Sequence, residues 1–459
     1  MKQLLITNLC YPQVAIMRQG RLCRLVSDSE MGQAGDIYLA KVVRVLPALA
    51  VAFLDIGEGK NAILSLLDIS ITVGQLLIVQ LSRPAHAQKG AIATTAITLS
   101  SPYIVYKPQG AGIGVSTKLP KDKGNFLKKH LTDCLKNSSI KGGVVVRTLA
   151  QDIDSAVLVA HILYLYECWQ GVLTAKSISK TPQRLYRTPL PLAVLNDETG
   201  ITSLLIDDRV MYDEWHTFVK QYLPSIDSVT YHTPSLFDTY HVYTQLNNAL
   251  NVRVDLPSGA YLVINECEAM TVIDVNTGSL TNSSKNIIYQ ANLEAVQAVA
   301  DALILRQIGG LVVVDLINMK NLDDQKAIYQ AFQQVLADDT AKVVLAPMSQ
   351  FGLIELSREH RLSSLSDKYT HDCSTCHGVG KVKTLPTIAL AIVAKLTSLS
   401  HTLTVKDELI LRVGERLHAF LANDDTFKRT IVNLSCSCHI KIMVDYADDK
   451  YDILQNKSR

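Results

Sequence analysis

Three apolar runs decide the fold of this chain: Tyr261-Leu-Val-Ile264, Ala269-Met-Thr-Val-Ile-Asp-Val-Asn276 and Gly309-Gly-Leu-Val-Val-Val-Asp-Leu316. Each is short and rich in β-branched residues, which predicts a strand buried in a sheet. Between the second and third runs, Leu293, Val296, Ala300 and Leu303 recur at helical spacing, so residues 292–308 predict a crossover helix. A right-handed crossover would set its two flanking strands parallel, and side by side or nearly so.

Two of these runs carry an aspartate at the end of their apolar stretch, Asp274 and Asp315. Buried strands rarely carry a charge without a use, and open α/β sheets bind ligands at the carboxyl edge of their strands. We therefore expect both carboxylates to face one pocket, where a divalent cation would offset their repulsion. Hard oxygen ligands favour magnesium or manganese, which indicates a metal-assisted phosphodiester or phosphoryl site. The alternative is a pair of aspartates that cap strand ends or form salt bridges.

The same residues carry a resemblance to a known family. Glu268-Ala-Met-Thr-Val-Ile-Asp-Val-Asn-Thr-Gly278, Asn292-Leu-Glu-Ala295 and Gly309-Gly-Leu-Val-Val-Val-Asp-Leu-Ile-Asn-Met319 closely resemble the catalytic core of the ribonuclease E/G family of bacterial endoribonucleases. The motifs are long, and further matches are collinear along nearly the whole chain. The resemblance implies an α+β multidomain fold: an RNase H-like domain interrupted by an S1-like OB barrel and a 5′-sensor insert, then a DNase I-like α/β catalytic domain, a zinc link and a small α/β C-terminal domain.

Size and composition set bounds on function. A chain of 459 residues that is 48% hydrophobic is long enough for three or more domains and is not a disordered chain. We expect no membrane span, because no apolar run reaches the needed length, and no signal peptide. Nine cysteines, an odd count, fit a reducing, cytoplasmic location. A net charge of +2 argues weakly against a nucleic-acid partner, although a local basic groove remains compatible with it.

The first hundred residues predict two units. Residues 1–35 alternate apolar and polar positions, which indicates a β-meander with a turn at Gln19-Gly20, and they resemble the first part of the RNase H-like domain. Residues 36–100 predict short strands of a small barrel and resemble the S1-like OB barrel. Here Phe53 and Lys89 match RNA-contacting positions of the family, while Ile63 stands in place of a second aromatic residue. Without the resemblance, Phe53 would be read as a core residue. The connection 68–74 is shorter than the family usually has.

Residues 101–187 resemble the 5′-sensor. Val105, Arg147 and Thr148 match the pocket that holds a substrate 5′-monophosphate, and a guanidinium and a hydroxyl are suited to phosphate oxygens. A surface ion pair is the commoner use of an arginine. Ser101 replaces a glycine that some members use in this pocket. Asp154 to Gln170 predicts an amphipathic helix.

Residues 188–255 resemble the second part of the RNase H-like domain, with a structural role, and residues 256–370 resemble the catalytic domain. There the resemblance assigns Asp274 and Asp315 to magnesium and places Asn276 beside the attacking water or the scissile phosphate. Asn318 stands where the family usually has a second aspartate, so Asp315 is preferred as the metal ligand. Arg306 and Arg358 are candidates for phosphate contacts.

Residues 371–381 contain Cys373-Ser-Thr-Cys376, half of a zinc site, since zinc takes four ligands. The resemblance implies that two chains share one zinc, giving a homodimer or a dimer of dimers. Cys436 and Cys438 with His439 could instead complete a site within one chain, and a redox dithiol is a third reading. Residues 382–459 resemble the small C-terminal domain, and we expect no counterpart of the scaffold that carries a degradosome in ribonuclease E.

The resemblance implies magnesium-dependent cleavage of single-stranded RNA, in ribosomal RNA precursors and messenger RNA, with 5′-phosphate products and stimulation by a 5′-monophosphate. The alternative is a catalytically weakened RNA-binding protein of the same family. Ile63, the shortened barrel and the low charge favour the alternative. Asp274, Asn276 and Asp315 oppose it, because a pure binder needs no acidic pair facing phosphate.

Overall fold

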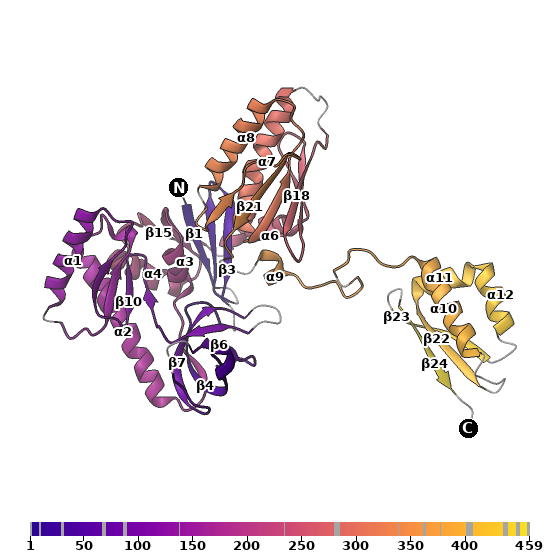
Figure 1. Ribbon diagram of the computed structural model, residues 1–459, viewed down its shortest axis with the longest axis horizontal. Helices are drawn as coiled ribbons and strands as arrows, with labels where there is room; N and C mark the ends of the chain where they lie inside the picture. Colours follow the sequence, from indigo (N-terminus) through magenta and orange to yellow (C-terminus); the bar gives the residue numbers. More distant parts are fainter. Residues whose placement is uncertain are drawn as a thin grey trace. The chain divides into compact units, whose positions relative to one another are not determined.

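The chain is a mixed α+β protein with several sheets and a closed five-stranded barrel. The computed structural model describes residues 2–8, 11–28, 32–66, 70–85, 90–136, 138–233, 235–279, 285–337, 339–360, 364–376, 378–400, 407–434, 439–446 and 450–456. Two compact units divide the chain, Met1–Lys368 and Tyr369–Arg459. Figure 1 follows the elements along the sequence.

The first sheet has the order β15-β14-β1-β2-β3. Its strands are β1 (Lys2–Thr7), β2 (Gln13–Arg18), β3 (Arg21–Ser27), β14 (Ile201–Ile206) and β15 (Ser228–Tyr231). The predicted turn at Gln19-Gly20 is confirmed: φ is positive at both residues (52° and 77°), as a tight hairpin requires. Around the sheet lie α3 (Leu190–Asp197), α4 (Arg209–Tyr222), α5 (Leu236–Thr239) and α6 (Val242–Leu250). β1 pairs in parallel with β14, so the sheet is interrupted after β3 and completed much later in the chain.

The barrel is built from β4 to β8 and is closed by pairing of β4 with β7. Its strands are β4 (Ile37–Leu46), β5 (Val51–Asp55), β6 (Ala62–Ser65), β7 (Leu76–Arg83) and β8 (Ile92–Thr94), with a 3₁₀ turn at Pro47–Leu49; β13 (Gln183–Tyr186) adds to the edge of β4. Small residues such as Ala40, Ala52 and Ala62 are fully buried inside, where a barrel of this size has little room.

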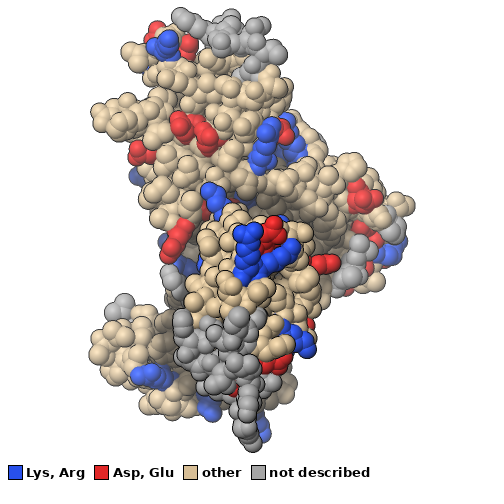
Figure 2. Space-filling model, turned by 90° about the vertical axis from the view of Figure 1, so that its right-hand side faces the viewer, with Lys and Arg blue, Asp and Glu red and all other residues tan. Residues whose placement is uncertain are grey.

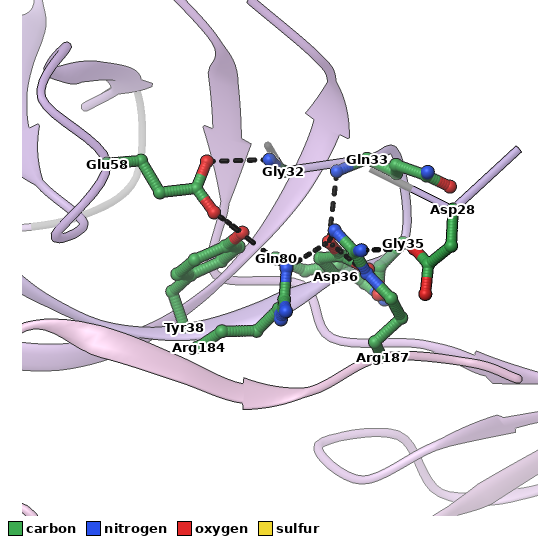
Figure 3. Close-up of polar contacts among 10 residues, drawn as sticks. All are labelled: Asp28, Gly32, Gln33, Gly35, Asp36, Tyr38, Glu58, Gln80, Arg184 and Arg187. Atoms are coloured by element: carbon green, nitrogen blue, oxygen red, sulfur yellow. Dashed lines mark hydrogen bonds and ion pairs between the residues drawn. The ribbon is translucent and has the colours of Figure 1, made fainter. Parts of the chain in front are cut away.

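A buried polar network fastens the barrel where the chain enters and leaves it (Figure 3). Arg187, which follows β13, donates to Asp36 at 2.6 Å and to Asp28 at 2.5 Å. The Asp36 side chain is only 3% exposed and also accepts from the Gln33 N–H at 2.9 Å. A buried carboxylate satisfied in this way stabilises one geometry, since removing one partner would leave a charge without compensation. The network therefore joins the first sheet, the barrel and the returning chain.

A third sheet has the order β11-β12-β10-β9. Its strands are β9 (Leu99–Ser100), β10 (Ile104–Lys107), β11 (Gly112–Val115) and β12 (Gly143–Val146), followed by a 3₁₀ turn at Thr148–Ala150; α1 (Lys121–Leu135) and α2 (Ser155–Ile178) pack with it. Asp154 caps α2 by accepting from the Ala156 N–H at 2.7 Å, which confirms the predicted start of this helix.

α2 corrects the expectation that no apolar run reaches the length needed to cross a membrane. Its 24 residues make it the one helix, in the part of the chain that is described, that is long and apolar enough to cross a membrane. Leu158, Ile162, Leu165 and Val172 on this helix are nevertheless buried in the same hydrophobic cluster as the first and third sheets. Core helices pass the same test of length and composition, and these four side chains of α2 lie in the core of the protein.

The six-stranded sheet β16-β17-β18-β19-β21-β20 contains all three of the apolar runs that predict buried strands. Its strands are β16 (Arg253–Asp255), β17 (Tyr261–Glu266), β18 (Thr271–Asn276), β19 (Gly310–Asp315), β20 (Val343–Leu345) and β21 (Leu353–Arg358). Two helices, α7 (Lys285–Leu305) and α8 (Leu322–Leu336), lie side by side against one face (Figure 1). The predicted crossover helix and the parallel pairing of β18 with β19 are confirmed.

The unit Tyr369–Arg459 has its own core and a three-stranded sheet of order β23-β22-β24. Its elements are α10 (Leu385–Ser400), β22 (Glu408–Gly414), α11 (Glu415–Asn423), α12 (Asp425–Leu434), β23 (His439–Tyr446) and β24 (Tyr451–Asn456). The short helix α9 (Leu365–Tyr369) spans the boundary between the two units.

Candidate active site

Asp274 and Asp315 are direct neighbours across the parallel pair β18–β19. In β18 the side chains alternate between buried and exposed, and both aspartates lie on the exposed face, opposite α7 and α8. Neighbouring strands lie about 4.8 Å apart, so the two carboxylates share one small area at the end of the sheet. The predicted side-by-side placement of these two residues is therefore confirmed.

Within the described residues, no ion pair forms at Asp274 or Asp315; Asp274 Oδ2 accepts one hydrogen bond, from Asn276 Nδ2 at 2.9 Å. The alternative of a salt-bridged pair therefore finds no support among the described residues. Two exposed carboxylates without cationic partners fit magnesium, which binds through one or two carboxylates and keeps several waters. No group of three or more His, Cys, Asp or Glu side chains is placed to hold a metal among the described residues, so waters and substrate would supply the other ligands.

Two close backbone contacts hold the loop that follows Asn276. Gly278 has φ +55°, and a Cβ on it would lie 2.2 Å from the carbonyl oxygen of Gly259. Ser279 donates its N–H to the same oxygen at 3.1 Å. Only glycine fits this approach, so the Thr-Gly sequence after Asn276 fixes the path of the chain beside the carboxylates. The loop after β19 is held from α7 by Asn292, which bonds the backbone of Ile317.

Two arginines proposed from the sequence as phosphate contacts are structural instead. Arg358 is 4% exposed and pairs with Asp339 at 2.7 Å. Arg306 is 5% exposed and donates to the carbonyl of Asn251 at 2.9 Å, and burial lowers the pKa of its guanidinium. Both side chains are held within the protein, and neither reaches the exposed face of the sheet.

A third carboxylate accompanies the pair. Glu355 on β21 is exposed and lies opposite Val313 of β19, hence on the same open face as Asp315. The sequence alone did not reveal Glu355, because the alternation of buried and exposed side chains along β21 is clear only once the strand register is known. Asn292 was missed for a different reason: a buried asparagine in an apolar helix was a visible signal, but its partner lies 25 residues away.

Phe53 lies on the outside of the barrel. Its neighbours in β5, Ala52 and Leu54, are fully buried in the barrel core, whereas Phe53 is half-buried on the opposite face. This overturns the core reading of Phe53. Across the strands its register partners are Arg44 on β4 and Ile63 on β6, and the same outer row continues through Ile92 to Arg83. The outer face of the barrel thus carries one aromatic and two aliphatic side chains in a row, with an arginine at each end. Lys89 lies outside the described residues.

Val105 and Arg147 line one cavity of about 460 Å³ between the barrel and the third sheet. Arg147 donates to the backbone carbonyl of Ser101 at 3.0 Å. The hydroxyl of Ser101 points into the turn between Ser101 and Ile104, where it accepts a hydrogen bond from the Ile104 N–H at 3.1 Å. It therefore does not fill the cavity. Thr148 does not line the cavity; its hydroxyl bonds that of Ser116 at 3.0 Å.

Cys373 and Cys376 lie in the unit Tyr369–Arg459, and both are free thiols. Hydrogen bonds from the backbone N–H groups of Cys376 and Thr375 lower the pKa of the exposed Cys373 thiol. A lowered pKa favours the thiolate, the form that binds zinc. Cys436 and Cys438, the rival zinc ligands within one chain, lie outside the described residues.

On the face drawn in Figure 2, lysines and arginines alternate with aspartates and glutamates and form no large basic area among the described residues. This distribution agrees with the net charge of +2. This face therefore offers local charged groups rather than a continuous basic surface among the described residues.

Comparison with known proteins gives one family. Residues 98–361 match the Ribonuclease E/G family. Ribonuclease G of Escherichia coli (strain K12) is 29% identical over 481 aligned positions, covering 98% of this chain and 97% of the relative. Ribonuclease G of Haemophilus influenzae is 29% identical and covers 90% of both chains. Ribonuclease E of Synechocystis sp. is 28% identical over 81% of this chain, which spans 59% of that longer protein.

Proposed function

Because the chain belongs to the ribonuclease E/G family, we propose that it is a magnesium-dependent endoribonuclease that cleaves single-stranded RNA and is stimulated by a substrate 5′-monophosphate. Precursors of ribosomal RNA and messenger RNA are the proposed substrates. The observation that carries the proposal is the register of Asp274 with Asp315, on an open sheet face and without cationic partners among the described residues.

In this proposal Asp274 and Asp315 hold the magnesium ion. When bound, the ion would activate water and stabilise the negative charge on the phosphoryl oxygens in the transition state. Asn276 keeps one side-chain N–H on Asp274, which orients its amide and leaves the other N–H and the carbonyl oxygen for the attacking water or the scissile phosphate. Cleavage leaves a 5′-phosphate and a 3′-hydroxyl.

Two other surfaces support RNA binding. The outer row of the barrel offers Phe53 for stacking and Arg44 and Arg83 for phosphates, as single-strand binders do. The cavity with Val105 and Arg147 would take the 5′ end, with the Arg147 guanidinium on the phosphate. We also propose that Cys373 and Cys376 of two chains share one zinc ion, which gives a homodimer or a dimer of dimers, and that the protein is cytoplasmic.

The test replaces one carboxylate at a time. Asp274→Asn and Asp315→Asn should each lower cleavage of a short AU-rich, 5′-monophosphorylated RNA at least a hundredfold and should raise the magnesium concentration needed for any residual activity. Asp255→Asn is the matched control, because Asp255 is a carboxylate on the same sheet that is already paired with Arg253. Full cleavage by both variants would refute the site. RNA binding without cleavage by the unmodified chain would instead support the second candidate, a catalytically weakened RNA-binding protein, which Ile63 and the shortened connection 68–74 favour.

A further inference from the structure

Phe351 is 80% exposed, and it is the most exposed large apolar side chain among the described residues. Single exposed apolar residues are common and usually need no explanation. Phe351 differs because of its place: it lies in the turn between β20 and β21, at the end of the sheet where Asp315 is the last residue of β19 and Asp274 lies beside it on β18.

The register of the sheet brings this turn to the carboxylates. Leu353, the first residue of β21, lies directly opposite Asp315 in the antiparallel pair β19–β21. Phe351 is two residues before Leu353. A strand advances about 3.3 Å per residue and its neighbour lies about 4.8 Å away, so the backbone of Phe351 lies within roughly 10 Å of that of Asp315.

The turn that carries Phe351 is held in one conformation. The hydroxyl of Ser349 accepts from the N–H groups of Phe351 at 3.3 Å and of Leu353 at 3.2 Å. Gly352 donates its N–H to the carbonyl of Ser349 at 2.9 Å and has φ +84°, a conformation that glycine adopts without strain. The Phe351 side chain has only two torsions, and its backbone is fixed. Little conformational entropy is therefore lost when a ligand stacks on its ring.

We propose that Phe351 stacks on a base of the RNA strand next to the scissile phosphate. The proposal rests on the assignment of Asp274 and Asp315 as the cleavage site. Every base has a flat aromatic face, so an exposed ring contacts single-stranded RNA without demanding one sequence. The barrel has an isoleucine, Ile63, beside Phe53, and Phe351 supplies an aromatic ring at the carboxylates themselves.

Kinetics give the first test. Base stacking on an aromatic side chain contributes to the free energy of RNA binding. Its loss in Phe351→Ala should lower kcat/KM about tenfold, mainly through a higher KM. Phe351→Tyr and Phe351→Trp should keep near-normal kcat/KM, and Phe351→Leu should resemble Phe351→Ala. The control is Val344→Ala, which shortens another exposed apolar side chain of the same sheet. Equal activity of the leucine and tryptophan variants would overturn stacking.

Binding gives the second test, and it separates this proposal from the assignment of the cleavage site. In an Asp315→Asn background, short RNAs carry the fluorescent base 2-aminopurine at successive positions. Emission at one position next to the scissile bond should fall on binding when residue 351 is Phe or Tyr, and should not fall when it is Ala or Leu. Loss of self-association in Phe351→Ala, measured by light scattering, with unchanged kcat/KM per chain would overturn the proposal and assign Phe351 to a contact between chains. Full cleavage by Asp315→Asn would refute the cleavage site alone, because the fluorescence reports stacking directly.

Discussion

The side-chain amide of Asn292 on α7 bonds both backbone polar groups of Ile317. Its Nδ2 donates to the Ile317 carbonyl at 2.8 Å, and its Oδ1 accepts from the Ile317 N–H at 3.0 Å. Asn292 is fully buried, and Ile317 comes two residues after Asp315. The amide therefore fixes the chain just beyond one of the two carboxylates, from the helix that connects their strands.

Replacing Asn292 should show how much activity depends on the position of the chain next to Asp315, because Asn292 itself bonds only the backbone of Ile317. Asn292→Leu leaves both polar groups of Ile317 without partners, which should lower the free energy of unfolding by about 2 kcal/mol and lower kcat more than it changes KM. Urea unfolding and steady-state kinetics at saturating magnesium measure the two effects. The matched control is Gln297→Leu, which removes an amide of the same helix whose Nε2 donates to Asp301 at 3.1 Å on the exposed side, and it should change neither. An unchanged kcat in Asn292→Leu would contradict the positioning role.

Arg147 should control the response to the RNA 5′ end. Arg147→Ala should bring kcat/KM for a 5′-monophosphorylated RNA down to the value for the same RNA with a 5′-hydroxyl. Arg147→Lys should restore part of the difference, since lysine keeps the charge but loses the forked geometry. Paired cleavage assays on the two RNAs measure the ratio. If the ratio stays high in Arg147→Ala, the cavity with Val105 is not where the 5′-phosphate binds.

His161 makes one core sensitive to pH. Burial lowers the pKa of this imidazole below its ordinary value of 6.5; its Nε2–H donates to the Tyr222 carbonyl at 2.7 Å, while Nδ1 is buried without a partner among the described residues. The unfolded chain then binds the proton more readily, so stability is lost as pH falls below the ordinary pKa towards the lowered one. We expect the urea concentration at the unfolding midpoint to decrease as the pH is lowered from about 8 to about 5. The decrease should be smaller in His161→Gln.

Fluorescence reports this core directly. The two tryptophans of the chain, Trp169 and Trp215, lie in the same hydrophobic cluster as the residues packed around His161. Their emission therefore follows unfolding of this cluster rather than of the sheet that carries Asp274 and Asp315. Parallel midpoints in the unmodified chain and in His161→Gln at every pH would show that another group causes the dependence.

Cys373 should determine both zinc content and assembly. Cys373→Ser should lose bound zinc and shift the protein to smaller species, measured by metal analysis and light scattering. In zinc-free protein, iodoacetamide should modify Cys373 at a lower pH than it modifies a free cysteine peptide, because backbone N–H groups lower the pKa of this thiol. Zinc that is retained with an unchanged mass would favour ligands within one chain, and a disulfide between Cys373 and Cys376 would favour redox chemistry.

The sequence was most informative where a short-range pattern determines structure. β18, α7 and β19 follow from apolar runs and helical spacing, and the meeting of Asp274 with Asp315 follows from the handedness of the crossover. The turn at Gln19-Gly20 follows from local preferences. All of these depend on residues near one another in the chain.

The features that the sequence did not reveal depend on register or on distant partners. Arg306 and Arg358 look like any exposed arginine until their partners, Asn251 and Asp339, are placed beside them. The outward direction of Phe53 depends on which face of β5 lines the barrel, and a shift of one residue would reverse it. The exposure of Phe351 is likewise set by a turn whose place beside Asp315 exists only in the assembled sheet.

The pairing of β1 with β14 also has a consequence for synthesis. Lys2 lies opposite Ile201, so the first strands leave the ribosome long before the strand that completes their sheet. Until then the apolar edge of β1, with Leu4, Leu5 and Ile6, has no neighbour on one side and can pair with other nascent chains. The barrel, whose strands β4 to β8 all lie between residues 37 and 94, can form in that interval without waiting. Translation rate across residues 100–200 should therefore influence how much of the protein escapes aggregation.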